Sequence, residues 1–313
     1  MLVVKCQGGI GNQMFQFALY RNLRDRRSDV FLDIHEYEEA RERSFDLDKA
    51  FAIAYRRFDY PILIWPLVNF DRYMNAKGKR TSGVRGLFGK VSGGLSRRAE
   101  NLYLSTFEHI SDRQFFDPGY LSGIGRAYLE GYWQSPRYFE EGDIRRAFSF
   151  SKPADPSVAL LLERIQSSHS IAIHFRRGDY AENPALTMIY GNICTPAYYA
   201  RAADLAMRRV GNPTFFVFSD DIEWVRHQSF VRELGNIVEV EINHRNSWTD
   251  MMLMSKCKHN IVANSSYSWW AAWLNDNPSK MVICPSKWVN EGYEDKLSDL
   301  SEILPRDWIK IDG

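Results

Sequence analysis

The chain has 313 residues, of which 45% are hydrophobic and 25% are charged, and its formal net charge at pH 7 is +1. This composition is typical of a globular protein of two domains, because hydrophobic cores tend to split above about 250 residues. The near-zero net charge excludes an overall basic field for nucleic acid. We expect neither a signal peptide, because the apolar run at the N-terminus is short, nor an apolar run of the about 18 residues that would span a bilayer.

The N-terminal residues begin with a pattern of strand, turn, helix and strand. The expected elements are a strand at LVVKC (2–6), a tight glycine-rich turn at GGIGNQ (8–13), a helix over 14–27 and a strand over 30–34. Phe15, Leu19 and Leu23 fall on one face of that helix. Beyond residue 34 the periodicity becomes too weak to assign elements.

Residues 77–98, KGKRTSGVRGLFGKVSGGLSRR, differ in composition from the rest of the chain. They contain seven Lys or Arg, six Gly and no acidic residue. This composition predicts a basic loop or insertion. Two interpretations remain open, which are a solvated loop and a patch that contacts an anionic membrane surface.

The second half alternates apolar strands with helices. The expected strands are 170–175, 214–220, 236–242, 259–265 and 280–286, and the expected helices are 195–210, 221–230, 249–257 and 266–276. This alternation predicts βαβ units with a parallel sheet, which is the pattern of a Rossmann-like domain.

Polar residues follow three of these strands. They are His174, Arg176 and Arg177, then Ser219, Asp220 and Asp221, and then Asn264, Ser265 and Ser266. Ligands of doubly wound sheets bind beyond the carboxyl ends of the strands. Arginines and helix N-termini both favour phosphate. The pattern therefore predicts a crevice for a diphosphate, with the glycine turn and Asn12 closing it from the other domain.

Each of these residues also has a structural interpretation. Arg176 or Arg177 could pair with Asp179 on the surface, and His174 could be a core histidine bonded to a backbone carbonyl. Ser265 and Ser266 could be helix caps.

Three further features have structural interpretations. We expect Trp269, Trp270 and Trp273 to pack in the core and the four cysteines to be buried free thiols in a reducing compartment. The stretch GYWQSPRYF (131–139) is compatible with sugar recognition and equally with a buried interdomain hinge.

Together these motifs resemble those of the bacterial α-1,2-fucosyltransferases of glycosyltransferase family 11. The resemblance rests on GGIGNQMFQFA, HFRRGDY, FFVFSDD, DMMLMSKCKHNIVANSSYSWWAAWLN and GYWQSPRYF, and extends from residue 7 to about residue 290. It implies a GT-B fold, with two Rossmann-like domains facing each other across a cleft. An acceptor-side domain is expected over 1–155 and a GDP-fucose-binding domain over 156–313.

The activity that the resemblance implies is inverting transfer of L-fucose from GDP-β-L-fucose to the 2-hydroxyl of a galactose-type acceptor. The acceptor would be a galactose-containing oligosaccharide or a lipid-linked glycan, in the synthesis of a surface glycan such as O-antigen. No metal or other cofactor is expected. The expected location is the cytoplasm, with peripheral membrane contact through 77–98 as an additional hypothesis.

The resemblance also implies individual roles. In the wider superfamily the first arginine of H-x-R-R contacts the diphosphate, which points to Arg176. An aspartate sixteen residues before a serine reads the guanine, as Asp250 and Ser266 are spaced here. The residues expected to bind GDP-fucose are Gly11, Asn12, Arg177, Ser219, Asp220, Asp250, Asn264, Ser265 and Ser266. The expected catalytic residues are Arg176, Asp179 and His174.

The general base is left open among Asp179, Glu182 and His174, with Asp179 favoured. Three other functions stay in competition. They are a metal-dependent transferase that uses Asp220 and Asp221 as ligands, a fucosyltransferase of α-1,6 linkage, and a binding module without catalysis.

Overall fold

The structure is a computed structural model. It describes residues 1–39, 44–61, 98–113, 115–150, 155–241, 246, 248–294, 300 and 302–313, so the basic segment up to residue 97 lies outside the described residues. The chain divides into two compact units. The first comprises Met1–Phe45, Ile53–Trp133 and Tyr138–Glu140, and the second comprises Asp46–Ala52, Gln134–Arg137 and Glu141–Gly313.

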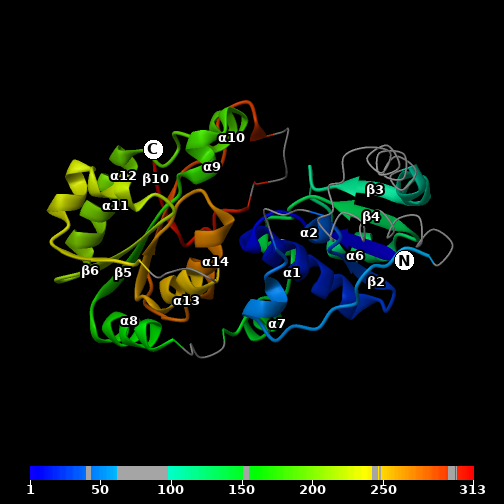
Figure 1. The fold of residues 1–313 in the computed structure, drawn as a ribbon, viewed down its shortest axis with the longest axis horizontal. Coiled ribbons are helices and arrows are strands. Elements are labelled where there is room, and N and C mark those ends of the chain that lie inside the picture. Colours follow the sequence, from blue (N-terminus) through cyan, green and yellow to red (C-terminus); the bar gives the residue numbers. More distant parts are fainter. Residues whose placement is uncertain are drawn as a thin grey trace, which may run out of the picture. The chain divides into compact units, whose positions relative to one another are not determined.

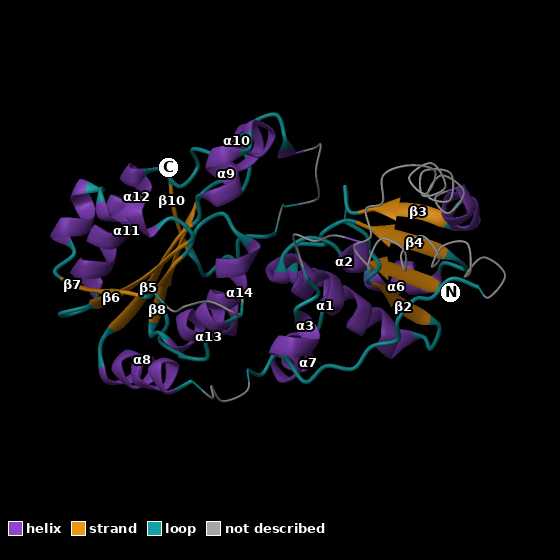
Figure 2. Ribbon diagram, viewed as in Figure 1, coloured by secondary structure: helices purple, strands orange, loops and turns teal. Residues whose placement is uncertain are grey.

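The first unit is built on a parallel sheet of four strands (Figures 1 and 2). The strands are β1 (Leu2–Lys5), β2 (Val30–Asp33), β3 (Glu108–Ser111) and β4 (Ala127–Glu130), in the order β2-β1-β4-β3. Val3 in β1 pairs with Phe31 on one side and with Tyr128 on the other. The two predicted strands are confirmed, whereas β3 and β4 lie where the sequence pattern gave no assignment.

Helix α1 (Ile10–Arg26) starts earlier than the sequence predicted. Gly9 is its N-cap, so Gly11 and Asn12 lie in the first helical turn and not in a separate loop. The expected apolar face at Phe15, Leu19 and Leu23 is fully buried, but so are Met14, Phe17 and Ala18 on other sides. The helix is therefore surrounded by protein, and a single apolar stripe describes it incompletely. The unit also contains α2 (Glu36–Glu39) and α6 (Pro118–Gly123).

A buried carboxylate shapes the turn after β4. Asp112 accepts hydrogen bonds from the backbone N–H groups of Tyr132 at 2.6 Å and Trp133 at 2.8 Å. Gly131 and Trp133 both have positive φ, at 148° and 56°. A Cβ on Gly131 would lie 2.2 Å from the Asp112 carboxyl, so only glycine permits this approach.

The second unit contains a parallel sheet of six strands. They are β5 (Ser170–Phe175), β6 (Thr214–Ser219), β7 (Asn236–Glu239), β8 (His259–Ile261), β9 (Val282–Pro285) and β10 (Ile309–Ile311). The spatial order is β10-β9-β8-β5-β6-β7, so the chain builds outward from β5 first in one direction and then in the other. This is the Rossmann order, and it confirms the five predicted strands. The short β10 was not predicted.

Helices cover both faces of this sheet, with α11 and α12 on one side and α13 and α14 on the other (Figure 2). The helical elements of the second unit are α3 (Leu47–Ala50), α7 (Glu141–Ala147), α8 (Pro156–Ser167), α9 (Gly178–Glu182), α10 (Pro184–Tyr190), α11 (Pro196–Arg209), α12 (Ile222–Arg226), η2 (Ser229–Glu233), α13 (Thr249–Lys256) and α14 (Ser266–Leu274). The short η1 (Pro136–Tyr138) is divided between the two units. The helix predicted over 221–230 is split into α12 and η2, because the backbone is extended at Gln228.

Helix α11 shows how local sequence fixes these elements. The Thr195 hydroxyl caps its N-terminus by accepting from the Tyr198 N–H at 3.2 Å, and Pro196 occupies the first helical position. Arg208 and Arg209 in the last turn complement the helix dipole. The helix buries one face, formed by Tyr198, Tyr199, Ala202, Ala203 and Ala206, in the core around β5 and β6.

Several expectations about packing are confirmed. Trp269 and Trp270 are fully buried and Trp273 is 8% exposed, so the tryptophans of α14 are core residues. All four cysteines are free thiols, although Cys194 is only partly buried. Among the helices of the described residues, none combines the length and apolar character needed to cross a membrane.

We predict that Asp112→Ala lowers the free energy of unfolding by about 2–4 kcal/mol, because two buried N–H groups lose their acceptor. Asp112→Asn should cost less, since its amide oxygen still accepts. Urea denaturation followed by circular dichroism measures both values. The control is Asp276→Ala, which removes a 77% exposed carboxylate and should change stability by less than about 0.5 kcal/mol. Equal stability of Asp112→Ala and the control would contradict this reading of the turn.

Candidate active site

The predicted site residues of the second unit gather at one edge of its sheet. The strand order reverses direction between β5 and β8, and this topological switch point is where doubly wound sheets bind ligands. Arg176 follows β5, and Asn264 follows β8. Ser219, the last residue of β6, pairs in register with Phe175 of β5. The geometric prediction that these strand ends meet is confirmed, while their roles in binding stay a prediction.

Arg176 lies between two carboxylates. Its Nη1 donates to Asp220 Oδ2 at 2.6 Å, and its Nη2 donates to Asp179 Oδ1 at 2.5 Å. Burial opposes the charge, but the two carboxylates outweigh it and raise the pKa of Arg176 above its ordinary value. The side chain is 30% exposed, so a ligand can reach it. Two of its five N–H donors are used in these bonds, which leaves donors for an anion.

Arg177 points to a different carboxylate. Its Nε donates to Asp221 Oδ2 at 3.2 Å, while its guanidinium lies 4.1 Å from the ring centre of Trp224. Its backbone N–H donates to Asp220 Oδ1 at 2.9 Å. The two adjacent arginines therefore avoid mutual repulsion by meeting separate partners. The surface pairing considered from the sequence does occur, between Arg176 and Asp179.

The carboxylates of Asp220 and Asp221 both accept hydrogen bonds from groups of the protein. Asp220 accepts from Arg176 and Arg177, and Asp221 caps α12 by accepting from the Trp224 N–H at 3.0 Å. Ser219 supports the same turn, because its Oγ accepts from the Asp221 N–H at 2.9 Å. Within the described ranges, no three His, Cys, Asp or Glu side chains are grouped to hold a metal ion.

A cavity of about 260 Å³ opens beside this corner. Its lining includes Arg176, Arg177, Tyr180, Tyr190 and Asn264. The rings of Tyr180 and Tyr190 stack with their centres 5.0 Å apart. The cavity thus combines guanidinium donors with flat aromatic surface, which are groups that suit a nucleotide or a sugar.

The side-chain amide of Asn264 makes its hydrogen bonds to groups of the protein itself. Its Nδ2 donates to the carbonyls of Tyr190 at 3.0 Å and Trp288 at 3.1 Å, and its Oδ1 accepts from Cys194 Sγ at 3.5 Å. Both N–H donors are used, so the side chain holds the loop after β8 in place and has no amide donor left for a ligand.

The N-termini of α13 and α14 lie together. The Met251 N–H donates to the Tyr267 hydroxyl at 3.0 Å, which ties the first turn of one helix to that of the other. Asp250 therefore lies in a first turn that contacts the start of α14, while its pairing with Ser266 in guanine recognition stays a prediction. Ser265 is the N-cap of α14, but its hydroxyl makes no capping hydrogen bond. The first-turn N–H groups of α14 are consequently not satisfied by that side chain.

His174 is unsuited to act as a base. It is 6% exposed, and burial together with the nearby Arg176 lowers its pKa to about 3. Among the described residues its Nδ1 has no hydrogen-bond partner, so the expected backbone carbonyl is not there. Asp179 is bonded to Arg176, and Glu182 is exposed at the end of α9. None of the three candidates has the geometry of an obvious general base, and the base stays unassigned.

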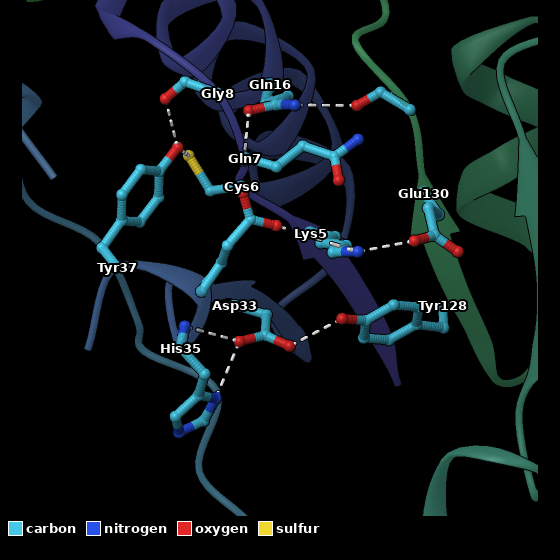
Figure 3. A network of polar contacts seen from close by, with 12 residues as sticks. Lys5, Cys6, Gln7, Gly8, Gln16, Asp33, His35, Tyr37, Tyr128 and Glu130 are labelled. Atoms are coloured by element: carbon cyan, nitrogen blue, oxygen red, sulfur yellow. Dashed lines mark hydrogen bonds and ion pairs between the residues drawn. The ribbon is translucent and has the colours of Figure 1, made fainter. Parts of the chain in front are cut away.

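The remaining predicted residues, Gly11 and Asn12, lie in the first unit, at the start of α1. Two residues that the sequence reasoning missed hold this region, as Figure 3 shows for Gln16. Gln16 Nε2 donates to the Gly131 carbonyl at 2.8 Å and its Oε1 accepts from the Gln7 N–H at 2.9 Å, while Gln13 Nε2 donates to the Gly8 carbonyl at 3.1 Å. Both amides are fully buried. Two glutamines three positions apart among the apolar residues of the first half of α1 were the available signal.

The stretch GYWQSPRYF is buried at Trp133, Gln134, Ser135, Tyr138 and Phe139 and exposed at Arg137. The chain passes from the first unit to the second between Trp133 and Gln134. Trp133 is fully buried, and Gln134 Oε1 accepts from Trp288 Nε1 at 3.2 Å. The burial of Trp133 and Gln134 argues against an exposed sugar platform at these residues, and the hinge interpretation stays a prediction.

Its strand order places the second unit among the Rossmann-type α/β folds. Residues 100–312 match the model of glycosyl transferase family 11, and the chain therefore belongs to that family. It is 28% identical to an alpha-1,2-colitosyltransferase of Escherichia coli over 100% of this chain and 99% of that one.

Two further relatives match over part of their length. An O-antigen biosynthesis glycosyltransferase, WbnK, of Escherichia coli is 38% identical over 42% of this chain and 43% of its own. A galactoside alpha-(1,2)-fucosyltransferase 1 of Saimiri boliviensis boliviensis is 28% identical over 42% of this chain and 37% of its own. The predicted family is thus confirmed.

We predict that His174 makes the protein less stable in acid. Its imidazole takes up a proton near its ordinary pKa of 6.5 when unfolded, but only near about 3 when folded. Protons therefore favour the unfolded state below pH 6.5, and stability falls as the pH drops toward 3, by about 2 kcal/mol between pH 7 and pH 5. His174→Gln should flatten this dependence in urea denaturation series. His227→Gln, at an exposed histidine, serves as the control. The same pH slope in wild type and His174→Gln would refute the assignment.

Proposed function

We propose that the protein transfers L-fucose from GDP-β-L-fucose to the 2-hydroxyl of a galactose-type acceptor, with inversion at the anomeric carbon and without a metal ion. The coarser statement, a glycosyltransferase of family 11, is established by the family match. Support for the finer one comes from relatives named as galactoside α-(1,2)-fucosyltransferases and as an α-1,2-colitosyltransferase. The relative named for O-antigen biosynthesis supports a surface glycan as the product.

The observation that carries the proposal is the position of Arg176 at the switch point of the second sheet. In the reaction, the bond between the anomeric carbon and the β-phosphate oxygen breaks while the oxygen of the acceptor hydroxyl bonds to that carbon. The hydroxyl proton is released, to a base that is not assigned or to water. The bonding electrons leave with GDP, so negative charge grows on the diphosphate. A guanidinium that is already held in place stabilises this charge without reorganisation, and such electrostatic stabilisation is usually the largest catalytic effect.

Asp179 and Asp220 act in this proposal as positioning residues. They hold the Arg176 guanidinium at 2.5 and 2.6 Å, so that its remaining donors face the diphosphate. The N-terminal end of α14 would add the positive end of its helix dipole, and Asp250 in the first turn of α13 would accept from the guanine edge. Gly11 and Asn12 at the start of α1 remain proposed phosphate contacts from the first unit.

Transfer of colitose is a second candidate. It is favoured by the match to the colitosyltransferase, which extends over both chains almost entirely. Colitose is fucose without its 3-hydroxyl, so the two sugars differ at one position.

A metal-dependent reaction at Asp220 and Asp221 is disfavoured by their contacts. An ion there would have to displace Arg176, Arg177 and the capped N-terminus of α12 from these carboxylates.

The function is tested by supplying the purified protein with GDP-fucose or GDP-colitose and a panel of β-galactosides. We expect GDP release with GDP-fucose, an α-linkage to O2 of galactose by NMR, and full activity in EDTA. Loss of activity that Mn²⁺ restores would instead support the metal-dependent reaction, and a different linkage in the NMR spectrum would refute the acceptor position. GDP binding with neither donor turned over would favour a binding module.

The role of Arg176 is tested by Arg176→Ala. We predict a fall in kcat of about 10²–10³, the loss typical when one donor to a developing anion is removed, in a protein that circular dichroism shows to be folded. Arg208→Ala, which removes an exposed arginine of the same unit, should keep wild-type turnover. Near-normal turnover of folded Arg176→Ala would refute the diphosphate assignment.

A further inference from the structure

A second cavity, of about 670 Å³, lies within the first unit and takes no part in the proposed donor site. Lys5, Asp33 and Glu130, the last residues of β1, β2 and β4, line it. The carboxyl ends of parallel strands are where α/β sheets bind ligands. The helical residues 98–104, which include Glu100, and the turn after them supply another wall. His109 of β3 also lines the cavity.

A buried carboxylate organises the floor of this cavity (Figure 3). Asp33 accepts hydrogen bonds from His35 Nδ1 at 2.7 Å, from the His35 backbone N–H at 3.0 Å and from the Tyr128 hydroxyl at 2.7 Å. Asp33 and His35 are each 5% exposed. Burial alone would raise the pKa of Asp33, but the bonds from His35 and Tyr128 hold it below its ordinary value. Asp33 is therefore a carboxylate with three donors directed at it.

This carboxylate sets the tautomer of the neutral imidazole. Because Asp33 only accepts, the proton of neutral His35 sits on Nδ1, and Nε2 carries a lone pair. Figure 3 shows this second ring nitrogen pointing away from Asp33. Among the described residues no hydrogen bond reaches it, and His35 lines the cavity. The site thus offers a fixed, oriented acceptor to a hydroxyl group.

The charges around the cavity select against anions. Glu36, Glu100 and Glu130 join Asp33 in its lining, whereas Lys5 is the one lysine or arginine among the described lining residues. Lys5 is itself paired, at 2.6 Å to Glu130 and 4.0 Å to Glu36. A ligand that carries a carboxylate or phosphate meets repulsion here, while a polyol finds several acceptors. The volume lies in the range of pockets that hold small organic ligands, about 300–1,000 Å³.

We propose that this cavity binds an uncharged sugar of the acceptor glycan and that His35 Nε2 accepts a hydrogen bond from one of its hydroxyls. The proposal rests on the proposed function only in naming the ligand as the acceptor. Asp33 and Tyr128 act as positioning residues, since they hold the ring and its tautomer. The acceptor preference that follows is for neutral over anionic galactosides.

The test is saturation-transfer NMR with the full chain in the presence of GDP, using lactose and its sialylated derivative as probes. We expect lactose to bind, sialyllactose to bind at least tenfold more weakly, and His35→Ala to weaken lactose binding by about tenfold, as loss of a hydrogen bond to a buried acceptor predicts. His35→Gln places an amide near the position of Nε2 and should recover part of this loss.

Controls separate this proposal from a purely structural role of His35. GDP affinity by calorimetry should be equal in wild type, His35→Ala and His227→Ala, since the proposed donor site lies in the other unit. Lactose binding that is equal in wild type and His35→Ala would overturn the proposal, as would equal binding of lactose and sialyllactose or no binding of lactose to the folded wild type. A protein that binds lactose in this way but does not turn over GDP-fucose would refute the proposed function. That result would still support the binding of a neutral sugar in this cavity.

Discussion

The site of the second unit depends on one arrangement of charge, the Arg176 guanidinium held between Asp179 and Asp220. A half-buried arginine costs desolvation energy unless it is paired and hydrogen-bonded. One of its partners comes from the adjoining helix α9 and the other from the end of β6, so the pairing links two neighbouring strand ends. The fully buried strand β5 can therefore end in two arginines, because each meets a carboxylate that the fold supplies.

The topology explains why binding groups collect where they do. Each unit has its own parallel sheet. Within each sheet the carboxyl ends of the strands lie at one edge, so polar residues that follow different strands become neighbours. In the second unit this edge gathers guanidinium groups and helix N-termini, which suit an anion. In the first unit it gathers Asp33, His35 and Glu130, which suit hydroxyl groups. The two chemistries match the two proposed substrates, a nucleotide diphosphate and a neutral sugar.

The sequence predicted much of the second unit and little of the first beyond residue 34. Apolar runs and motif spacing located β5 to β9 and the corner at Arg176, because short βαβ units are read from local periodicity. They did not reveal that the Asn264 amide donates hydrogen bonds to the carbonyls of Tyr190 and Trp288, since such contacts join residues far apart in the chain. The His35 site was missed for the same reason, as Tyr128 reaches Asp33 across 95 positions. The sequence Asp-x-His at the end of a strand was the signal.

A crystal structure of the protein with GDP tests the central claim most directly. The account predicts an oxygen of the diphosphate within about 3 Å of the Arg176 guanidinium, the distance of a charge-assisted hydrogen bond, with Asp179 and Asp220 still holding its other donors. A nucleotide whose phosphates lie away from this corner, with Arg176 bonded to the two aspartates alone, would contradict it.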